Sequence, residues 1–154
     1  MSGTLEERIQ RLEDIGAIRR LKHRYMAYAD AGYDADGIMT LMTPDAVWDG
    51  GEAFGRQEGA EAFGDMVRGV GKQISFAAHL ALNEIIDVDG DTARGQWWLL
   101  MPCTALNDEG QDEARWIFAT YDDRLVKRDG QWLFAHTVFD VKTFCAHKDG
   151  WAEA

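Results

Sequence analysis

The second half of the chain is a series of long strand-like segments separated by turns, and this pattern constrains the fold more than any other feature. The turn signals are Asp89-Gly90-Asp91, Asn107-Asp108-Glu109-Gly110 and Arg128-Asp129-Gly130. They bound predicted strands at residues 72–88, 92–106, 113–127 and 131–144. Strands joined by such short turns pair antiparallel. The sequence therefore predicts one large sheet in this half of the chain.

The first half is predicted to be mainly helical. Thr4 is followed three residues later by Glu7, which is the spacing of a capping box at a helix start. Apolar residues then recur in steps of three and four, at Leu5, Ile9, Leu12, Ile15, Ile18, Leu21 and Tyr25. This helix is expected to reach Asp30 and to stop near Gly32. A short helix at 36–42, a strand at 46–49 and a third helix at 57–70 follow.

Helices first and strands afterwards are typical of the α+β class. The 154 residues fit a single domain. We expect its core to span about 5–145 and its tail 146–154.

Charge and composition exclude several classes of function. The chain has 27 acidic and 16 basic residues and a net charge of −11, so nucleic acid and anionic membranes are not expected as partners. No apolar run approaches the roughly 20 residues that span a bilayer, and no signal peptide is recognisable. Cys103 and Cys145 lack metal-site spacing, and we interpret them as reduced thiols in a cytoplasmic protein.

The predicted strand at 72–88 is apolar on both faces. One face carries Ile74, Phe76, Leu80 and Leu82, and the other includes Ala81 and Ile85. A two-layer monomer leaves one sheet face in water, where such residues are unfavourable. We therefore expect a homo-oligomer, a dimer or trimer, that covers the outer sheet face.

Several motifs together resemble a known family, the SnoaL-like branch of the nuclear-transport-factor-2-like superfamily, which contains scytalone dehydratase. The matching pieces are the helix segment 17–25, Ala29-Asp30, the strand 44–48, His79-x-x-x-Asn83, the segment 88–93 and the Arg-Asp-Gly-x-Trp turn at 128–132. The resemblance implies a cone-shaped fold, in which a curved antiparallel or mixed sheet wraps around N-terminal helices and encloses one apolar pocket. It also implies chemistry without a metal or organic cofactor.

The same resemblance nominates three catalytic residues. Asp30 and His79 match the Asp-His pair of scytalone dehydratase, bile-acid dehydratase and hexachlorocyclohexane dehydrochlorinase, and Tyr25 resembles a pocket tyrosine of the bile-acid enzyme. A neutral imidazole can remove a proton next to a carbonyl or a leaving group. A carboxylate on the other ring nitrogen fixes the tautomer and stabilises the imidazolium. A phenol can donate a hydrogen bond to the substrate oxygen.

Five further residues are candidates for substrate binding: Trp48, Asn83, Cys103, His136 and Lys142. Trp48 and Asn83 match family positions, and Cys103 is a possible pocket wall. His136 and Lys142 share one predicted face of the last strand with Trp132, and they reach a substrate only if that face looks inward. Phe144 and Trp151 suit the role of lid residues. No second histidine occurs in 97–104, so scytalone itself is not expected as the substrate.

The sequence thus predicts a lyase or isomerase, dehydratase-like, that acts on a small, hydroxylated, ring-containing apolar molecule. His79 is the expected base, Asp30 its orienting partner and Tyr25 a donor. Two alternatives stay open. One is a small-molecule-binding protein that uses the same pocket without turnover. The other is an enzyme in which Asp30 itself is the base, as in ketosteroid isomerases.

Overall fold

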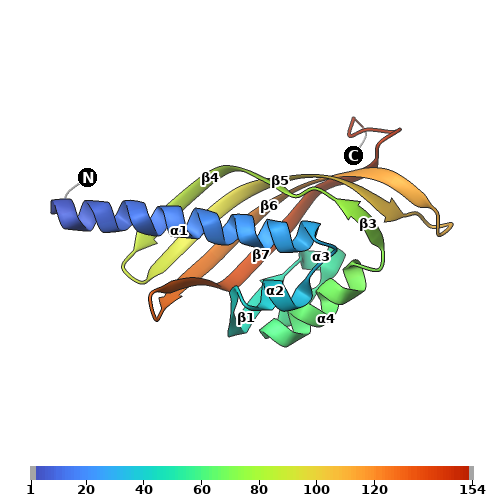
Figure 1. The fold of residues 1–154 in the computed structure, drawn as a ribbon. Helices are drawn as coiled ribbons and strands as arrows, with labels where there is room; N and C mark the ends of the chain where they lie inside the picture. The colour runs from blue at the N-terminus through green and yellow to red at the C-terminus, as the bar shows by residue number, and fades with distance from the viewer. Residues whose placement is uncertain (1–2, 153–154) are drawn as a thin grey trace.

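The computed structural model describes residues 3–152 and shows helices packed on one side of a large curved sheet (Figure 1). The helices are α1 (Leu5–Asp30), α2 (Ala35–Met39), α3 (Gly51–Phe54) and α4 (Ala60–Val70). The strands are β1 (Met42–Asp49), β2 (Arg56–Glu58), β3 (Ile74–Ala77), β4 (Leu80–Asp89), β5 (Thr92–Leu106), β6 (Asp112–Arg128) and β7 (Gln131–Ala146). None of the helices within this described range could cross a bilayer.

The sheet is mixed and does not close into a barrel. Its strand order is β2-β1-β7-β6-β5-β3, with β4 also pairing with β5. Strands β1 and β7 run parallel, and the other pairs are antiparallel. The predicted α+β class and curved mixed sheet are confirmed.

Helix α1 lies along the sheet and begins as predicted. The Thr4 side chain accepts from the Glu7 amide, and the Glu7 side chain accepts from the Thr4 amide, which completes the capping box. The apolar stripe is buried only in the second part of the helix. Leu5 and Leu12 are 64% and 69% exposed, because the first turns of α1 project beyond the sheet (Figure 1).

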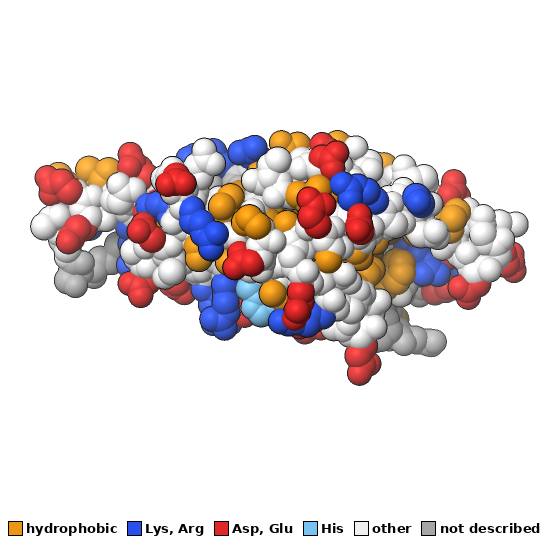
Figure 2. All heavy atoms as spheres, turned by 90° about the horizontal axis from the view of Figure 1, so that it is seen from below, with side chains coloured by type: hydrophobic (Ala, Val, Ile, Leu, Met, Phe, Trp, Pro, Cys, Tyr) orange, Lys and Arg blue, Asp and Glu red, His pale blue; other side chains and the backbone are white. Residues whose placement is uncertain are grey.

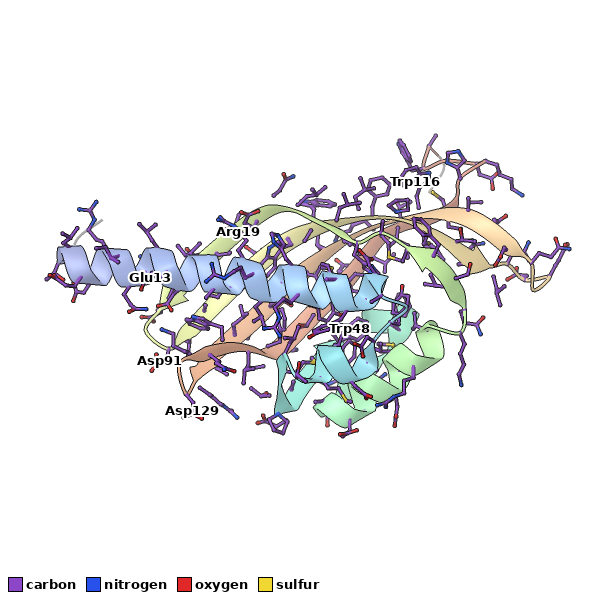
Figure 3. The ribbon with its side chains drawn as sticks, in the orientation of Figure 1. Glu13, Arg19, Trp48, Asp91, Trp116 and Asp129 are labelled. Atoms are coloured by element: carbon purple, nitrogen blue, oxygen red, sulfur yellow. The ribbon has the colours of Figure 1, made fainter. Side chains whose placement is uncertain are left out.

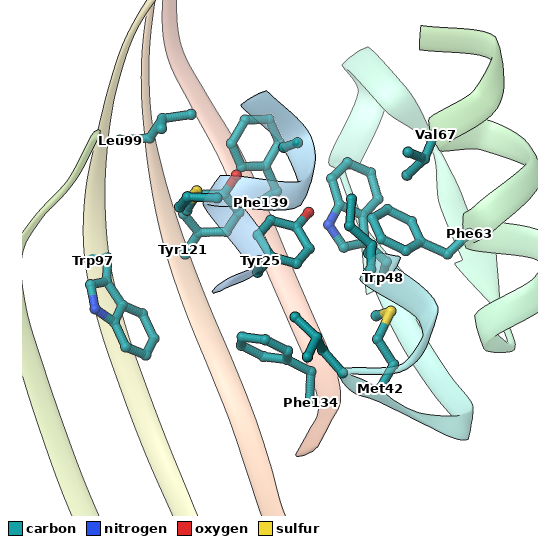
Figure 4. Packing of buried hydrophobic residues seen from close by; sticks show 14 of the residues in the cluster. Tyr25, Met42, Trp48, Phe63, Val67, Trp97, Leu99, Tyr121, Phe134 and Phe139 are labelled. Carbon is teal, nitrogen blue, oxygen red and sulfur yellow. The ribbon is translucent and has the colours of Figure 1, made fainter. Parts of the chain in front are cut away.

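The core lies between the helices and the inner face of the sheet (Figure 4). Along β5 every second residue from Ala93 to Ala105 is buried, so the strand turns one face to the helices and the other outward. Seen from below the view of Figure 1, where α2 and α4 lie, the surface carries acidic and basic side chains interspersed with small apolar spots (Figure 2).

The predicted strand at 72–88 is interrupted. Strands β3 and β4 both pair with β5, but Ala78 and His79 between them lie outside either strand. Other element boundaries also differ from the predicted ones. Helix α2 ends at Met39 because Met42 already belongs to β1, and the segment predicted as a helix from residue 57 opens with β2 before α4 begins.

The C-terminal segment packs on the outer face of the sheet. Trp116 Nε1 lies 2.9 Å from His147 Nδ1, and the Trp151 ring contacts the rings of Trp116 and Phe118. Figure 3 shows Trp116 on this outer side, whereas Trp48 lies between the helices and the sheet. Trp151 therefore lies on the side of the sheet away from the helices.

Candidate active site

An apolar cavity lies between the inner face of the sheet and helices α1, α2 and α4. It encloses about 560 Å³ of unfilled space, counting the part that opens to solvent. Its lining is mostly aromatic and aliphatic, and its polar members are His79, Tyr25, Tyr33, Tyr121 and Trp48.

His79 and Asp30 form a hydrogen-bonded pair at this cavity. The His79 amide donates to Asp30 Oδ1 at 2.9 Å, and His79 Nδ1 lies 2.7 Å from the same oxygen. A carboxylate oxygen only accepts, so Nδ1 carries the ring proton and Nε2 keeps its lone pair. Asp30 is held in place by the last turn of α1, and His79 by the break between β3 and β4.

Burial distinguishes the two partners. The His79 side chain is 7% exposed and lines the cavity, whereas the Asp30 side chain is 36% exposed and lies behind the imidazole. Burial lowers the pKa of His79, because an apolar site disfavours the imidazolium; the hydrogen bond and charge of Asp30 oppose this, and the charge of Lys22 adds to it. The His79 ring is therefore uncharged at neutral pH, as a general base requires.

One aromatic residue, Tyr33, lies beside the pair. The Tyr33 ring meets the His79 ring edge-on with 5.8 Å between centroids. Its backbone is left-handed, with φ of 59°, which is strained for a tyrosine and costs free energy that the surrounding contacts must supply. Tyr33 was not among the residues that the sequence nominated. Its position three residues after Asp30, next to Gly32 at the end of the helix, was the available signal.

Tyr25 and Trp48 form the wall opposite. Tyr25 is 8% exposed and Trp48 is 4% exposed. The Trp48 ring stacks between Phe63, at 5.1 Å, and Phe139, at 5.6 Å. Burial raises the pKa of Tyr25 far above its ordinary value, so its hydroxyl stays protonated and can donate. The structure thus brings three of the nominated residues, His79, Tyr25 and Trp48, into the lining of one cavity, and it places Asp30 behind His79.

The other nominated residues lie elsewhere. Asn83 sits at a bulge of β4 with φ of 53° and faces the outer side of the sheet. His136 and Lys142 also lie outside the cavity lining: His136 pairs with Arg124, and Lys142 forms an ion pair with Asp140. Cys103 is buried on the inner face two residues beyond Met101, and burial raises the pKa of its thiol.

The face of β7 changes because of a bulge. The register with β6 shifts between Leu125 opposite Phe134 and Arg124 opposite His136. Trp132 consequently points inward, where its Nε1 donates to Asp14 at 2.9 Å, while His136 points outward. The common face predicted for Trp132, His136 and Lys142 does not exist, because one extra residue reverses the alternation.

A buried ion pair underlies the cavity wall. Lys22 Nζ lies 2.8 Å from Asp123 Oδ2, and the two side chains are 1% and 0% exposed. Lys22 Nζ also lies over the Tyr121 ring, 3.4 Å from its centroid. Burial lowers the pKa of Lys22 and raises that of Asp123, and the attraction between them opposes both shifts. The sequence analysis did not single out Lys22, although it lies four residues from both Ile18 and Met26 on the buried stripe.

Within residues 3–152, no cluster of three or more His, Cys, Asp or Glu side chains has the arrangement of a metal site. The polar groups in the cavity lining are the basic ring nitrogen of His79 and the hydrogen-bond donors of the tyrosines and Trp48. That combination can move one proton and stabilise one oxygen.

Comparison with known proteins agrees with this fold. The profile of the SnoaL-like domain family matches residues 10–138. Among solved structures, hexachlorocyclohexane dehydrochlorinase LinA-type3 from Novosphingobium barchaimii LL02 superposes with a TM-score of 0.79, at 23% identity over 95% of each chain. An NTF2-like protein with a cystatin-like fold from Novosphingobium aromaticivorans gives 0.72, at 22% identity over 97% of this chain and 92% of that one. At these identities the likenesses show the fold.

Proposed function

This chain belongs to the SnoaL-like domain family, and from that premise we propose that it is a cofactor-independent lyase or isomerase of the dehydratase-like type. The substrate is a small, hydroxylated, ring-containing apolar molecule. His79 Nε2 removes a proton from carbon, Asp30 orients the ring and stabilises the imidazolium, and Tyr25 donates to a substrate oxygen. The pair formed by Asp30 Oδ1 with both N–H groups of His79 is the observation that carries this proposal.

The surroundings of the pair favour His79 over Asp30 as the base. Asp30 Oδ1 is already engaged by two N–H groups, and Asp30 is not among the residues that line the cavity. His79 lines the cavity and keeps a lone pair on Nε2. The ketosteroid-isomerase-like alternative would need the carboxylate to face the substrate directly, so the geometry disfavours it.

The first experiment follows the titration of His79 by NMR of ring-labelled histidine. Asp30 raises the pKa of His79, so Asp30→Asn should lower it further and should weaken the preference for the Nδ1–H tautomer. His79→Ala assigns the resonance. Asp36→Asn is the matched control, because Asp36 is an exposed acid paired with Arg68 and should leave the resonance unchanged. A titration of His79 that ignores Asp30→Asn would contradict the dyad.

The second experiment measures turnover. A panel of β-hydroxy ketones and halogenated cyclohexanes is screened for enone absorbance and for halide release. His79→Ala should lower kcat by about 10²–10⁴-fold with ligand binding retained, and Asp30→Asn should cost less than His79→Ala. Ligands that bind the cavity and leave unchanged would favour the non-catalytic alternative. A larger loss in Asp30→Asn would favour the carboxylate as base.

A further inference from the structure

The loop between α1 and α2 turns one side chain inward. Of its residues 31–34, only Tyr33 is partly buried, and the other three are exposed. The Tyr33 side chain lines the cavity, and its ring meets the His79 ring at 76° with 5.8 Å between centroids. Tyr33 therefore connects this loop to the proposed base.

The loop backbone adopts an uncommon conformation where it makes this contact. Tyr33 has φ of 59° and Gly32 before it has φ of 79°, so two consecutive residues are left-handed. Glycine enters this region freely, whereas a tyrosine is strained there because its Cβ crowds the backbone. Glycine or asparagine would be the favourable residue at position 33, so the presence of a tyrosine indicates a role for its ring.

Three helices hold the loop in this conformation. The Tyr33 amide donates to the Ala29 carbonyl at 2.9 Å, which ties the loop to the last turn of α1. The Asp34 side chain accepts from the Gly37 amide at 3.0 Å and caps α2. Helix α4 ends at Gly71, where a Cβ would lie only 3.1 Å from Tyr33 Cβ. Because these contacts fix the loop, the Tyr33 ring has a fixed place beside the imidazole.

The Tyr33 ring restrains a motion that the hydrogen bond to Asp30 leaves free. His79 Nδ1 lies 2.7 Å from Asp30 Oδ1, and this bond holds one edge of the imidazole. A single hydrogen bond still lets the imidazole plane rock about it. An aromatic ring set nearly perpendicular to that plane opposes the rocking, and aromatic pairs favour this arrangement. The two contacts together determine where the Nε2 lone pair points.

The same ring helps to cover the imidazole. Burial is the largest cause that lowers the pKa of His79, and the Tyr33 ring in contact with it supplies part of that burial. The charged groups that act on His79 are Asp30, which raises its pKa, and Lys22, which lowers it. Tyr33 adds no charge at neutral pH, because burial raises the pKa of its phenol far above the ordinary value.

We propose that Tyr33 is a positioning residue for His79, whose aromatic ring fixes the plane of the imidazole against Asp30 and keeps water away from it. The ring of Tyr33, rather than its hydroxyl, has this role. The proposal rests on the proposed function, because His79 is the base of the same site. The left-handed backbone at Tyr33 is what brings the ring to the imidazole.

NMR of ring-labelled histidine tests this proposal without a substrate. Tyr33→Asn removes the ring, and asparagine tolerates a left-handed backbone. It should raise the pKa of His79 toward the ordinary value, because water then reaches the imidazole, and should increase the population of the Nε2–H tautomer. Tyr33→Phe keeps the ring and should change neither quantity. Tyr28→Asn is the matched control and should also change neither, because the partly buried Tyr28 ring lies against Gly37 and outside the cavity lining.

Turnover of a substrate from the panel above provides a second measurement. Tyr33→Asn should lower kcat by about 10–100-fold, because a misdirected base is slow even when the substrate is bound. The loss should fall on kcat more than on KM, since the ring acts through His79. Tyr33→Phe should keep kcat within about twofold of the unmodified protein.

Tyr33→Gly is the second variant if Tyr33→Asn does not fold, because glycine adopts this φ without strain, and it should give the same changes. An unchanged titration and tautomer of His79 in the variant without the ring, whatever its urea midpoint, would overturn the proposal. Equal changes in Tyr33→Phe would also overturn it, because they would assign the role to the hydroxyl. Asp30→Asn lowers the pKa of His79 whereas Tyr33→Asn raises it, so failure of the dyad and failure of the Tyr33 proposal are distinguishable.

Discussion

Replacing Lys22 with methionine should destabilise the protein strongly, because it removes one partner of a fully buried ion pair. Asp123 would keep a carboxyl group that is 0% exposed, whose Oδ1 has no hydrogen-bond partner among residues 3–152 and whose Oδ2 would lose its cation. Breaking such a pair costs about 3–5 kcal/mol, which is a large part of the roughly 5–15 kcal/mol that stabilises a domain. For a domain of this size we expect a fall in Tm of about 10 °C.

Urea unfolding at fixed protein concentration measures the effect, with the double variant Lys22→Met/Asp123→Leu beside it. The double variant should recover most of the loss, because no charge is then left buried. Lys142→Met is the control, since the exposed pair with Asp140 should contribute about 0–1 kcal/mol. A loss below about 1 kcal/mol in Lys22→Met, or a double variant no more stable than the single, would refute the reasoning.

The pH dependence of the free energy of unfolding of Lys22→Met provides an independent test. In Lys22→Met, burial raises the folded pKa of Asp123 without a cation to oppose it, while the unfolded pKa stays near about 3.9. The folded variant therefore holds a proton that the unfolded chain has released. Its free energy of unfolding should fall as the pH rises between these two pKa values, and should partly recover on acidification.

Three other predictions follow from the structure. The kcat/KM should fall as the pH drops through the pKa of His79, which lies below 6.5, because only the neutral ring accepts a proton; a profile flat down to about pH 4 would contradict this. Thr4→Ala should speed amide exchange in the projecting turns of α1 while lowering global stability by less than about 0.5 kcal/mol, since those turns pack on little; a larger loss in urea would show that they are structural. Gly69→Ala should stabilise the folded protein by about 0.5–1 kcal/mol, because a Cβ at this helical position meets no other atom. Gly95→Ala should destabilise it by about 1–3 kcal/mol, because its Cβ would lie 1.9 Å from the Trp97 ring. The reverse order of the two urea midpoints would refute both predictions.

Local signals were sufficient where local contacts determine the structure. The capping box at Thr4 and the turns at Asp89–Asp91 and Asn107–Gly110 place the start of α1 and both ends of β5 as predicted. These features depend on residues a few positions apart, which a sequence pattern records directly.

Features that depend on distant partners were not predictable in this way. The Asp30 carboxylate accepts a hydrogen bond from the backbone amide of His79, 49 residues away. His79 itself lies where the predicted strand divides into β3 and β4. Lys22 is buried because of Asp123, 101 residues away. The orientation of His136 follows from a bulge in β7 that no turn residue in the sequence indicates. The resemblance to a family found Asp30 and His79 because it carries long-range information that periodicity lacks.

The carboxylate behind His79 also fixes what kind of molecule can rest in the cavity. With Nδ1–H committed to Asp30, the neutral ring presents only a lone pair, so near pH 7 a resting ligand at that point must bring its own hydrogen, as an alcohol, phenol or amide does. Once the ring is protonated, the same atom becomes a cationic donor and prefers anions. One proton thus reverses the polarity that the cavity offers its ligands. Inhibitors chosen at acidic pH should therefore differ in kind from those chosen at neutral pH.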